Sequence, residues 1–161
     1  MLNKAALLAA APFGLALLAG AALPFQASSN ASLGRTLGHP LWGAMVSLVV
    51  SLLVIIPTLW VVNAPAPTLA PALRGPWWLW IGGVVGAVYV CGATVLIPSL
   101  GAAGFLVCVV AGQMVTAVLS DHHGWMGLAE KPVTLTRLAG VALILLGVLL
   151  VHGLGNRQPP A

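Results

Sequence analysis

Long apolar runs, each near the length that crosses a lipid bilayer, alternate with short polar or proline-rich segments along the chain. We expect five membrane-spanning helices, over about residues 5–34, 40–62, 77–97, 102–120 and 135–153. They are separated by a proline-rich loop at 63–76, a tight turn at 98–101 and a loop at 121–136. The pattern therefore predicts an all-α integral membrane protein, with a single five-helix transmembrane domain over residues 1–161.

The first apolar run, Met1–Leu23, also has the outline of a secretory signal peptide, because Lys4 precedes an apolar core and a group of small residues. However, the run is long enough to span, and it continues past Pro24 into a polar helical extension that a removed leader would not need. We therefore expect it to be retained as the first span. Pro12 and Pro24 are candidates for kinks, since each removes a backbone donor.

Composition assigns most of the chain to a lipid environment. Of its 161 residues 60% are hydrophobic and only 5% are charged, and the mean hydropathy is +1.08. Soluble domains carry about 25% charged residues, so too few charges are present here to cover a water-facing surface. Trp42 and Trp60 are separated by roughly 27 Å of helix, close to the hydrocarbon thickness, and are expected to mark the two interfaces.

The net charge of +4 comes from six Lys/Arg against two Asp/Glu, scattered singly, so no basic patch is available to bind nucleic acid. The positive residues lie slightly more often on the amino-terminal side of the predicted spans: Lys4, Arg74, Lys131 and Arg137, against Arg35 and Arg157. This weak bias is compatible with one fixed orientation and a parallel dimer or another partner chain. It is also compatible with insertion in both directions, in which two copies form a ten-span antiparallel dimer, although a fixed orientation is the plainer interpretation.

One polar stripe lies on the fourth predicted span. Starting from Gln113, helical spacing places three more polar side chains on the same face: Thr116, Ser120 and Asp121. Hydrocarbon offers such a stripe no hydrogen-bond partner, so it must face protein or water. The other spans contain deep neutral polar groups, several of them one helical turn apart: Gln26, Asn30, Ser47, Ser51, Tyr89 and Thr94.

No acid or base lies at the middle of any predicted span, which argues against exchange of an organic cation for protons at a buried carboxylate. Neutral amides and hydroxyls suit a neutral or zwitterionic solute. The predicted substrate-binding residues are Gln26, Asn30, Gln113, Tyr89, Ser47 and Ser51. Each has a structural alternative, because intramembrane amides more often join helices, for about 0.6–2 kcal/mol, and Ser47 and Ser51 can bond to their own helix.

Asp121, His122 and His123 form a titratable cluster at the end of the fourth span. A histidine beside a carboxylate can change charge near neutral pH, so Asp121 and His122 are a candidate proton-transfer or gating pair. The plainer interpretation is a helix end wetted by headgroup water. Adjacent residues on one turn rarely converge on an ion, and no embedded Ser/His/Asp set or HExxH motif is present, so we expect no metal, no cofactor and no enzyme activity.

Taken in order, six short motifs resemble the YdcZ-like family of small five-span proteins in the drug/metabolite transporter superfamily. They are Gln26-x-x-x-Asn30, Pro76-Trp77-Trp78-x-Trp80-x-Gly82-Gly83, Pro98-x-x-Gly101, Gly112-Gln113, Asp121-His122-x-Gly124 and Arg137-x-x-Gly140. The resemblance implies an integral protein of the bacterial inner membrane, a transporter, and one half of an inverted-repeat assembly. His123 stands where the family pattern leads us to expect an aromatic residue, so the resemblance implies no role for it.

Two functions follow as alternatives. The first is a transporter of small neutral or zwitterionic solutes that works by alternating access, as a homodimer or paralogous heterodimer enclosing a midplane site. The second is a non-transporting membrane subunit that assembles with a partner protein. The transporter hypothesis requires Gln26, Asn30 and Gln113 to face a shared crevice rather than lipid.

Overall fold

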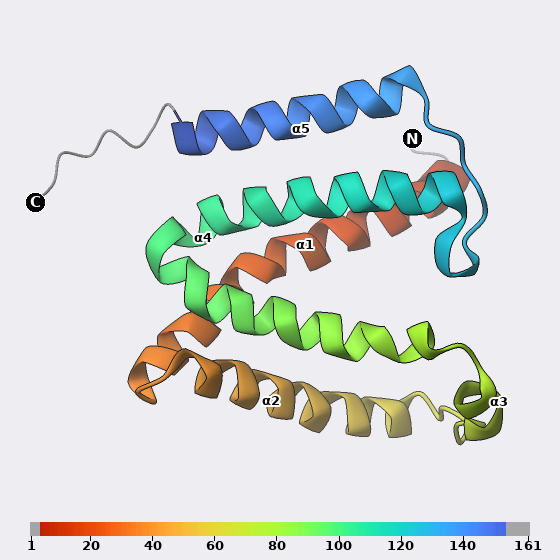
Figure 1. Cartoon of the computed structure of the whole chain (residues 1–161). Helices are drawn as coiled ribbons and strands as arrows, with labels where there is room; N and C mark the ends of the chain where they lie inside the picture. Colours follow the sequence, from red (N-terminus) through yellow and green to blue (C-terminus); the bar gives the residue numbers. More distant parts are fainter. Residues whose placement is uncertain (1–3, 154–161) are drawn as a thin grey trace, which may run out of the picture.

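The computed structural model describes residues 4–153, with side chains over residues 10–152. Regular structure in this part is all helical, with four long helices: α1 (Lys4–Thr36), α2 (Pro40–Val61), α4 (Ile81–His123) and α5 (Leu135–Gly153). Three short helices lie in the connections: α3 (Leu69–Arg74) and the 3-10 helices η1 (Trp77–Trp80) and η2 (Trp125–Gly127). Successive long helices run in opposite directions, and α4 folds back on itself (Figure 1).

The reversal of α4 takes place at one residue, Gly101. Its backbone angles are φ 71° and ψ 161°, a combination that is essentially restricted to glycine. Pro98 and the two residues after it remain helical, so the change of direction is narrower than the turn predicted over 98–101. The residues on either side of Gly101 therefore belong to two helical halves that run in opposite directions (Figure 1).

Four segments of the described chain are long and apolar enough to cross a membrane: Ala10–Thr36, Pro40–Val61, Trp77–His123 and Leu135–His152. The third has 47 residues and contains the reversal at Gly101. The structure thus confirms the predicted all-helical chain with several membrane-length helices. It does not confirm the predicted count of five separate spans.

The connections differ from the prediction in detail. Helix α3 lies inside the proline-rich segment 63–76, for which the sequence predicts a loop. Pro71 is its third residue, where a backbone N–H would have no intrahelical acceptor, so proline is tolerated there. At the other end of α4, the helix continues to His123 and Gly124 ends it in the left-handed conformation, with φ 60°. The loop predicted over 121–136 is correspondingly shorter.

Helices α1 and α2 form a tightly packed hairpin. The ring nitrogen Nδ1 of His39 accepts a hydrogen bond from the N–H of Leu41 at 3.2 Å and so caps α2. A side chain at Gly43 would overlap the carbonyl oxygen of Asn30 and lie 2.7 Å from the backbone nitrogen of Gly34. The backbones of α1 and α2 can therefore meet at this point only because Gly43 has no side chain.

The buried core is small. It is made of Ala27 and Ala31 from α1 with Ala93, Ile97 and Phe105 from α4, on both sides of the reversal. Most large apolar side chains lie outside it, and Leu15, Leu53 and Leu143 are exposed over 68%, 64% and 68% of their surfaces. This distribution suits lipid as the surrounding solvent, because helices in lipid associate through close packing of small residues rather than through burial of large ones.

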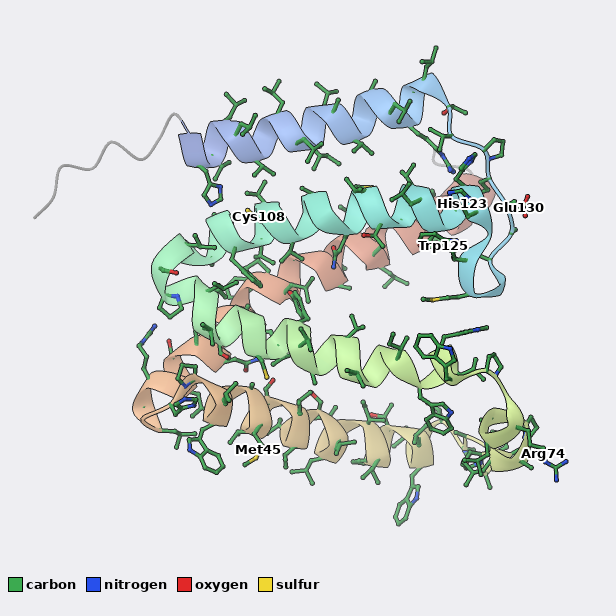
Figure 2. The ribbon with its side chains drawn as sticks, in the orientation of Figure 1. Met45, Arg74, Cys108, His123, Trp125 and Glu130 are labelled. Atoms are coloured by element: carbon green, nitrogen blue, oxygen red, sulfur yellow. The ribbon has the colours of Figure 1, made fainter. Side chains whose placement is uncertain are left out.

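Polar connections gather at the two ends of the helices. Arg74, His123, Trp125 and Glu130 lie at one end of the molecule (Figure 2). The turn between α1 and α2, which carries His39, lies at the opposite end (Figure 1). Both ends thus have the composition expected of membrane–water interfaces.

Substitution Gly43→Ala is expected to destabilise the fold by roughly 1–3 kcal/mol, because the added methyl group must push α2 away from the backbone of α1. Unfolding of the purified protein in detergent, followed by tryptophan fluorescence, measures the effect. Gly20→Ala is the matched control, since a Cβ at Gly20 meets nothing within 4 Å. Equal stabilities of the two variants would contradict the proposed contact.

Candidate functional site

A groove of about 520 Å³ between α1 and α2 brings together four of the six predicted substrate-binding residues. Gln26 and Asn30 line it from α1, and Ser47 and Ser51 line it from α2. Its remaining walls are mostly aliphatic, and no charged side chain lines it. The groove therefore offers amides and hydroxyls in apolar surroundings, the combination that orients small uncharged ligands in proteins.

The division of α1 into two faces explains this placement. Ala27 and Ala31 point into the core with α4, whereas Gln26 and Asn30, each one position earlier, are turned towards α2. Gln26 is exposed, while Asn30 retains only 8% of its accessible surface. Ser29 also lines the groove and is not predicted from the sequence, although its position three residues after Gln26 puts it on the same helical face.

The two serines of α2 differ in what they can offer a ligand. The hydroxyl of Ser51 donates to the backbone carbonyl of Ser47 at 2.9 Å, so its proton is occupied and its oxygen can only accept. The hydroxyl of Ser47 has no hydrogen-bond partner among the described residues and can donate as well as accept. Ser47 is thus the more versatile contact of the pair.

Gln113 lies in a different groove, of about 510 Å³, together with the other polar residues of its stripe, Thr116, Ser120 and Asp121. Val85 from the first half of α4 and Leu128 from the following connection complete the walls. Within one chain, therefore, the structure does not bring Gln113 to the groove of Gln26 and Asn30. The crevice expected to be common to all three amides is divided between two places, so the requirement set above for the transporter hypothesis is met by Gln26 and Asn30 and not by Gln113.

Tyr89 is the sixth predicted substrate residue and lies against the core. Its ring centroid is 6.0 Å from that of Phe105, across the reversal of α4. Its hydroxyl is buried without a hydrogen-bond partner in the described part of the chain. It lines neither the groove of Asn30 nor that of Gln113.

The acid of the predicted gating pair has a partner that is not predicted from the sequence. Oδ2 of Asp121 accepts from Nη1 of Arg137 at 3.4 Å, which links the end of α4 to the start of α5. His122 is exposed, and its ring lies edge-on to His123 with centroids 4.8 Å apart. The role of Asp121 and His122 in gating or proton transfer stays a prediction.

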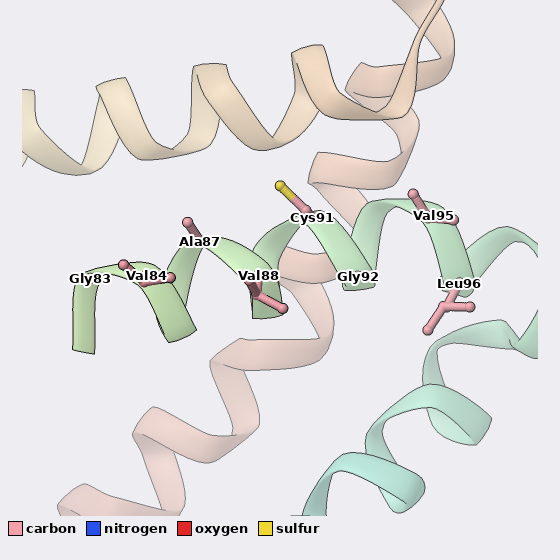
Figure 3. A pocket seen from close by; sticks show the side chains of 8 residues that line it. All are labelled: Gly83, Val84, Ala87, Val88, Cys91, Gly92, Val95 and Leu96. Atoms are coloured by element: carbon pink, nitrogen blue, oxygen red, sulfur yellow. The ribbon is translucent and has the colours of Figure 1, made fainter. Parts of the chain in front are cut away.

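A third groove, of about 810 Å³, runs along the first half of α4 and has a different chemistry (Figure 3). Its lining consists of glycine, alanine, valine, leucine and one thiol, that of Cys91. Added Cβ atoms at Gly83 and Gly92, which line it, would meet nothing within 4 Å. This face offers close approach to another apolar surface and almost no hydrogen bonding.

The structure holds no candidate metal centre within its described residues, where no group of three or more His, Cys, Asp or Glu side chains converges.

Comparison with known proteins identifies the family. The model of the family described as "Putative inner membrane exporter, YdcZ" matches residues 11–150, which include nearly all of the membrane-length segments. No curated protein and no solved structure matches the chain. The match confirms the resemblance of the sequence motifs and the inner-membrane location. Because this match covers most of the chain, the chain belongs to the YdcZ family, which is described as one of inner-membrane exporters.

Proposed function

We propose that this protein transports small neutral or zwitterionic solutes across the bacterial inner membrane and binds them in the groove between α1 and α2. The proposal is supported chiefly by one observation: polar residues from two different helices, Gln26 and Asn30 on one and Ser47 and Ser51 on the other, line the same uncharged groove.

The chemistry of the groove favours this class of solute. Carboxamides both donate and accept hydrogen bonds, and the hydroxyl of Ser47 does the same. A permanent cation would leave water without gaining a counter-ion, since no acidic side chain lines the groove. The amides and hydroxyls of the groove therefore match a solute that has several hydrogen-bonding groups and no net charge.

The proposed transport cycle is alternating access in a dimer. Each half of α4 on either side of Gly101 has about 20 residues, enough to cross the hydrocarbon region. Such a chain crosses five times and has its ends on opposite sides. Two copies in opposite orientations then give the inverted symmetry that alternating access commonly uses. The open, glycine-lined face of the first half of α4 is the surface we assign to the contact between copies.

The same face also favours the alternative, a non-transporting subunit. Gly83 and Gly92 leave room for a helix of a different protein as well as for a second copy. In that case Gln26, Asn30 and Ser47 would only hold helices together, and their loss would affect assembly instead of solute movement.

Asn30→Ala and Ser47→Ala are expected to weaken the apparent affinity for the transported solute roughly 3- to 10-fold each, the effect of losing one hydrogen bond. Efflux from proteoliposomes loaded with a panel of amino acids, small sugars and nucleosides identifies the solute and measures the change. Thr58→Val is the control, because it removes a hydroxyl from the same helix as Ser47, one that donates to the Val54 carbonyl at 2.7 Å and lies outside the groove. Unchanged transport in both groove variants would refute this binding site.

Reporter fusions at the carboxyl terminus test the orientation. If copies insert in both directions, a reporter active only in the cytoplasm and one active only in the periplasm will both give a signal. Replacing both Arg74 and Lys131 with glutamine is expected to shift the ratio of the two signals, because the difference in positive charge between the two sides of the membrane is small. A signal from one side alone would exclude the antiparallel dimer.

A further inference from the structure

The ion pair between Asp121 and Arg137 stands at one end of a groove of about 390 Å³ that separates the second half of α4 from α5. Beyond the two charged groups its walls are aliphatic, with Val118 on α4 and Ile144 on α5. Gly140 widens it, since an added Cβ there would meet nothing within 4 Å. The groove thus has a charged end at the membrane surface and an apolar length that runs about two helical turns into the membrane.

Both charges stand at the end of the helix that disfavours them. Asp121 lies in the last turn of α4, where the helix dipole is already negative, and Arg137 lies in the first turn of α5, where it is positive. The first turn of α5 contains no acidic residue. Pairing the two side chains offsets this mismatch. Because of the mismatch, the partial charge of each helix end adds to the charge of the residue beside it instead of neutralising it.

The chain itself uses only part of the hydrogen-bonding capacity of the ion pair between Asp121 and Arg137. One contact of 3.4 Å joins the two side chains, and no other side-chain hydrogen bond involves either of them among the described residues. An arginine has five N–H donors and a carboxylate can accept several bonds, so most of this capacity is free. The side chains of Arg137 and Asp121 are 36% and 33% exposed, and both line the groove.

We propose that this groove binds a zwitterion that carries an aliphatic tail. Its ammonium group would bind Asp121 and the end of α4, its anionic group would bind Arg137 and the start of α5, and its tail would lie against Val118 and Ile144. A ligand with one charge only would satisfy one helix end and leave the other residue without its partner. Two sources have this chemistry: the headgroup of phosphatidylethanolamine, and a free aliphatic amino acid. The site is separate from the groove of Asn30 and does not depend on the transport proposal.

Thermal unfolding of the purified full-length protein in a non-ionic detergent, followed by tryptophan fluorescence, tests the proposal. The probes are dioleoyl phosphatidylethanolamine, dioleoyl phosphatidylglycerol and L-leucine. At saturation, a zwitterionic probe is expected to raise Tm by about 5 °C, and the anionic lipid by much less. A response to phosphatidylethanolamine identifies a lipid site, and a response to leucine identifies a site for a free solute. Equal responses to both lipids, or no response to either zwitterion, would overturn the proposal.

Two variants separate binding from a purely structural ion pair. Exchanging the charges, as Asp121→Arg with Arg137→Asp, keeps the pair but lets each helix end neutralise its residue, so the response to the zwitterion should be lost while the protein stays folded. Gly140→Leu leaves the ion pair unchanged and fills the groove, so it should also abolish the response to the zwitterion. If the exchanged variant does not fold, the result with Gly140→Leu alone tests the proposal. Thr58→Val, which lies outside both grooves, should keep the full response. A response retained in the exchanged variant or in Gly140→Leu would show that the ligand binds elsewhere.

Discussion

Close approach of α1 to its neighbours through very small side chains is the contact on which the arrangement of this protein depends. Lipid tails are as apolar as leucine, so helices in a membrane gain little by burying large side chains against one another. Ala27 and Ala31 let α1 reach α4, and the absence of a side chain at Gly43 lets α2 reach α1. The same contacts fix how α1 is rotated, and that rotation turns Asn30 towards α2.

Three of the four grooves differ from one another in the chemistry of their walls. Between α1 and α2 the walls carry neutral hydrogen-bonding groups, along the first half of α4 they are apolar, and between α4 and α5 they end in opposite charges. Each groove therefore suits a different class of partner, namely an uncharged or zwitterionic solute, another helix, or an amphiphile. A chain of this size can hold all three because most of its surface faces lipid and only a few buried residues maintain the fold.

Helical periodicity is sufficient to predict which residues share a face of one helix, but it does not show which helices face each other. It places Gln26 with Asn30, and Gln113 with Asp121, and the structure has both sets together. It cannot show that Gln113 and Asn30 lie in separate grooves, because this depends on how α4 packs against α1. The ion pair between Asp121 and Arg137 cannot be predicted from the sequence for the same reason. A loop separates the two residues in sequence, and they meet only because the end of α4 packs beside the start of α5.

Gly101 has a mechanical consequence for the whole molecule. It is the pivot between two stiff arms, one bearing the glycine-lined face and the other bearing Gln113 and Asp121. Rotation about the backbone bonds of a glycine meets little steric resistance, so the angle between the arms can change without unwinding either of them. Contact of the Tyr89 ring with Phe105 opposes such a change near the pivot. Gly101 thus permits other angles between the two arms, and the packing of Tyr89 on Phe105 favours the observed one.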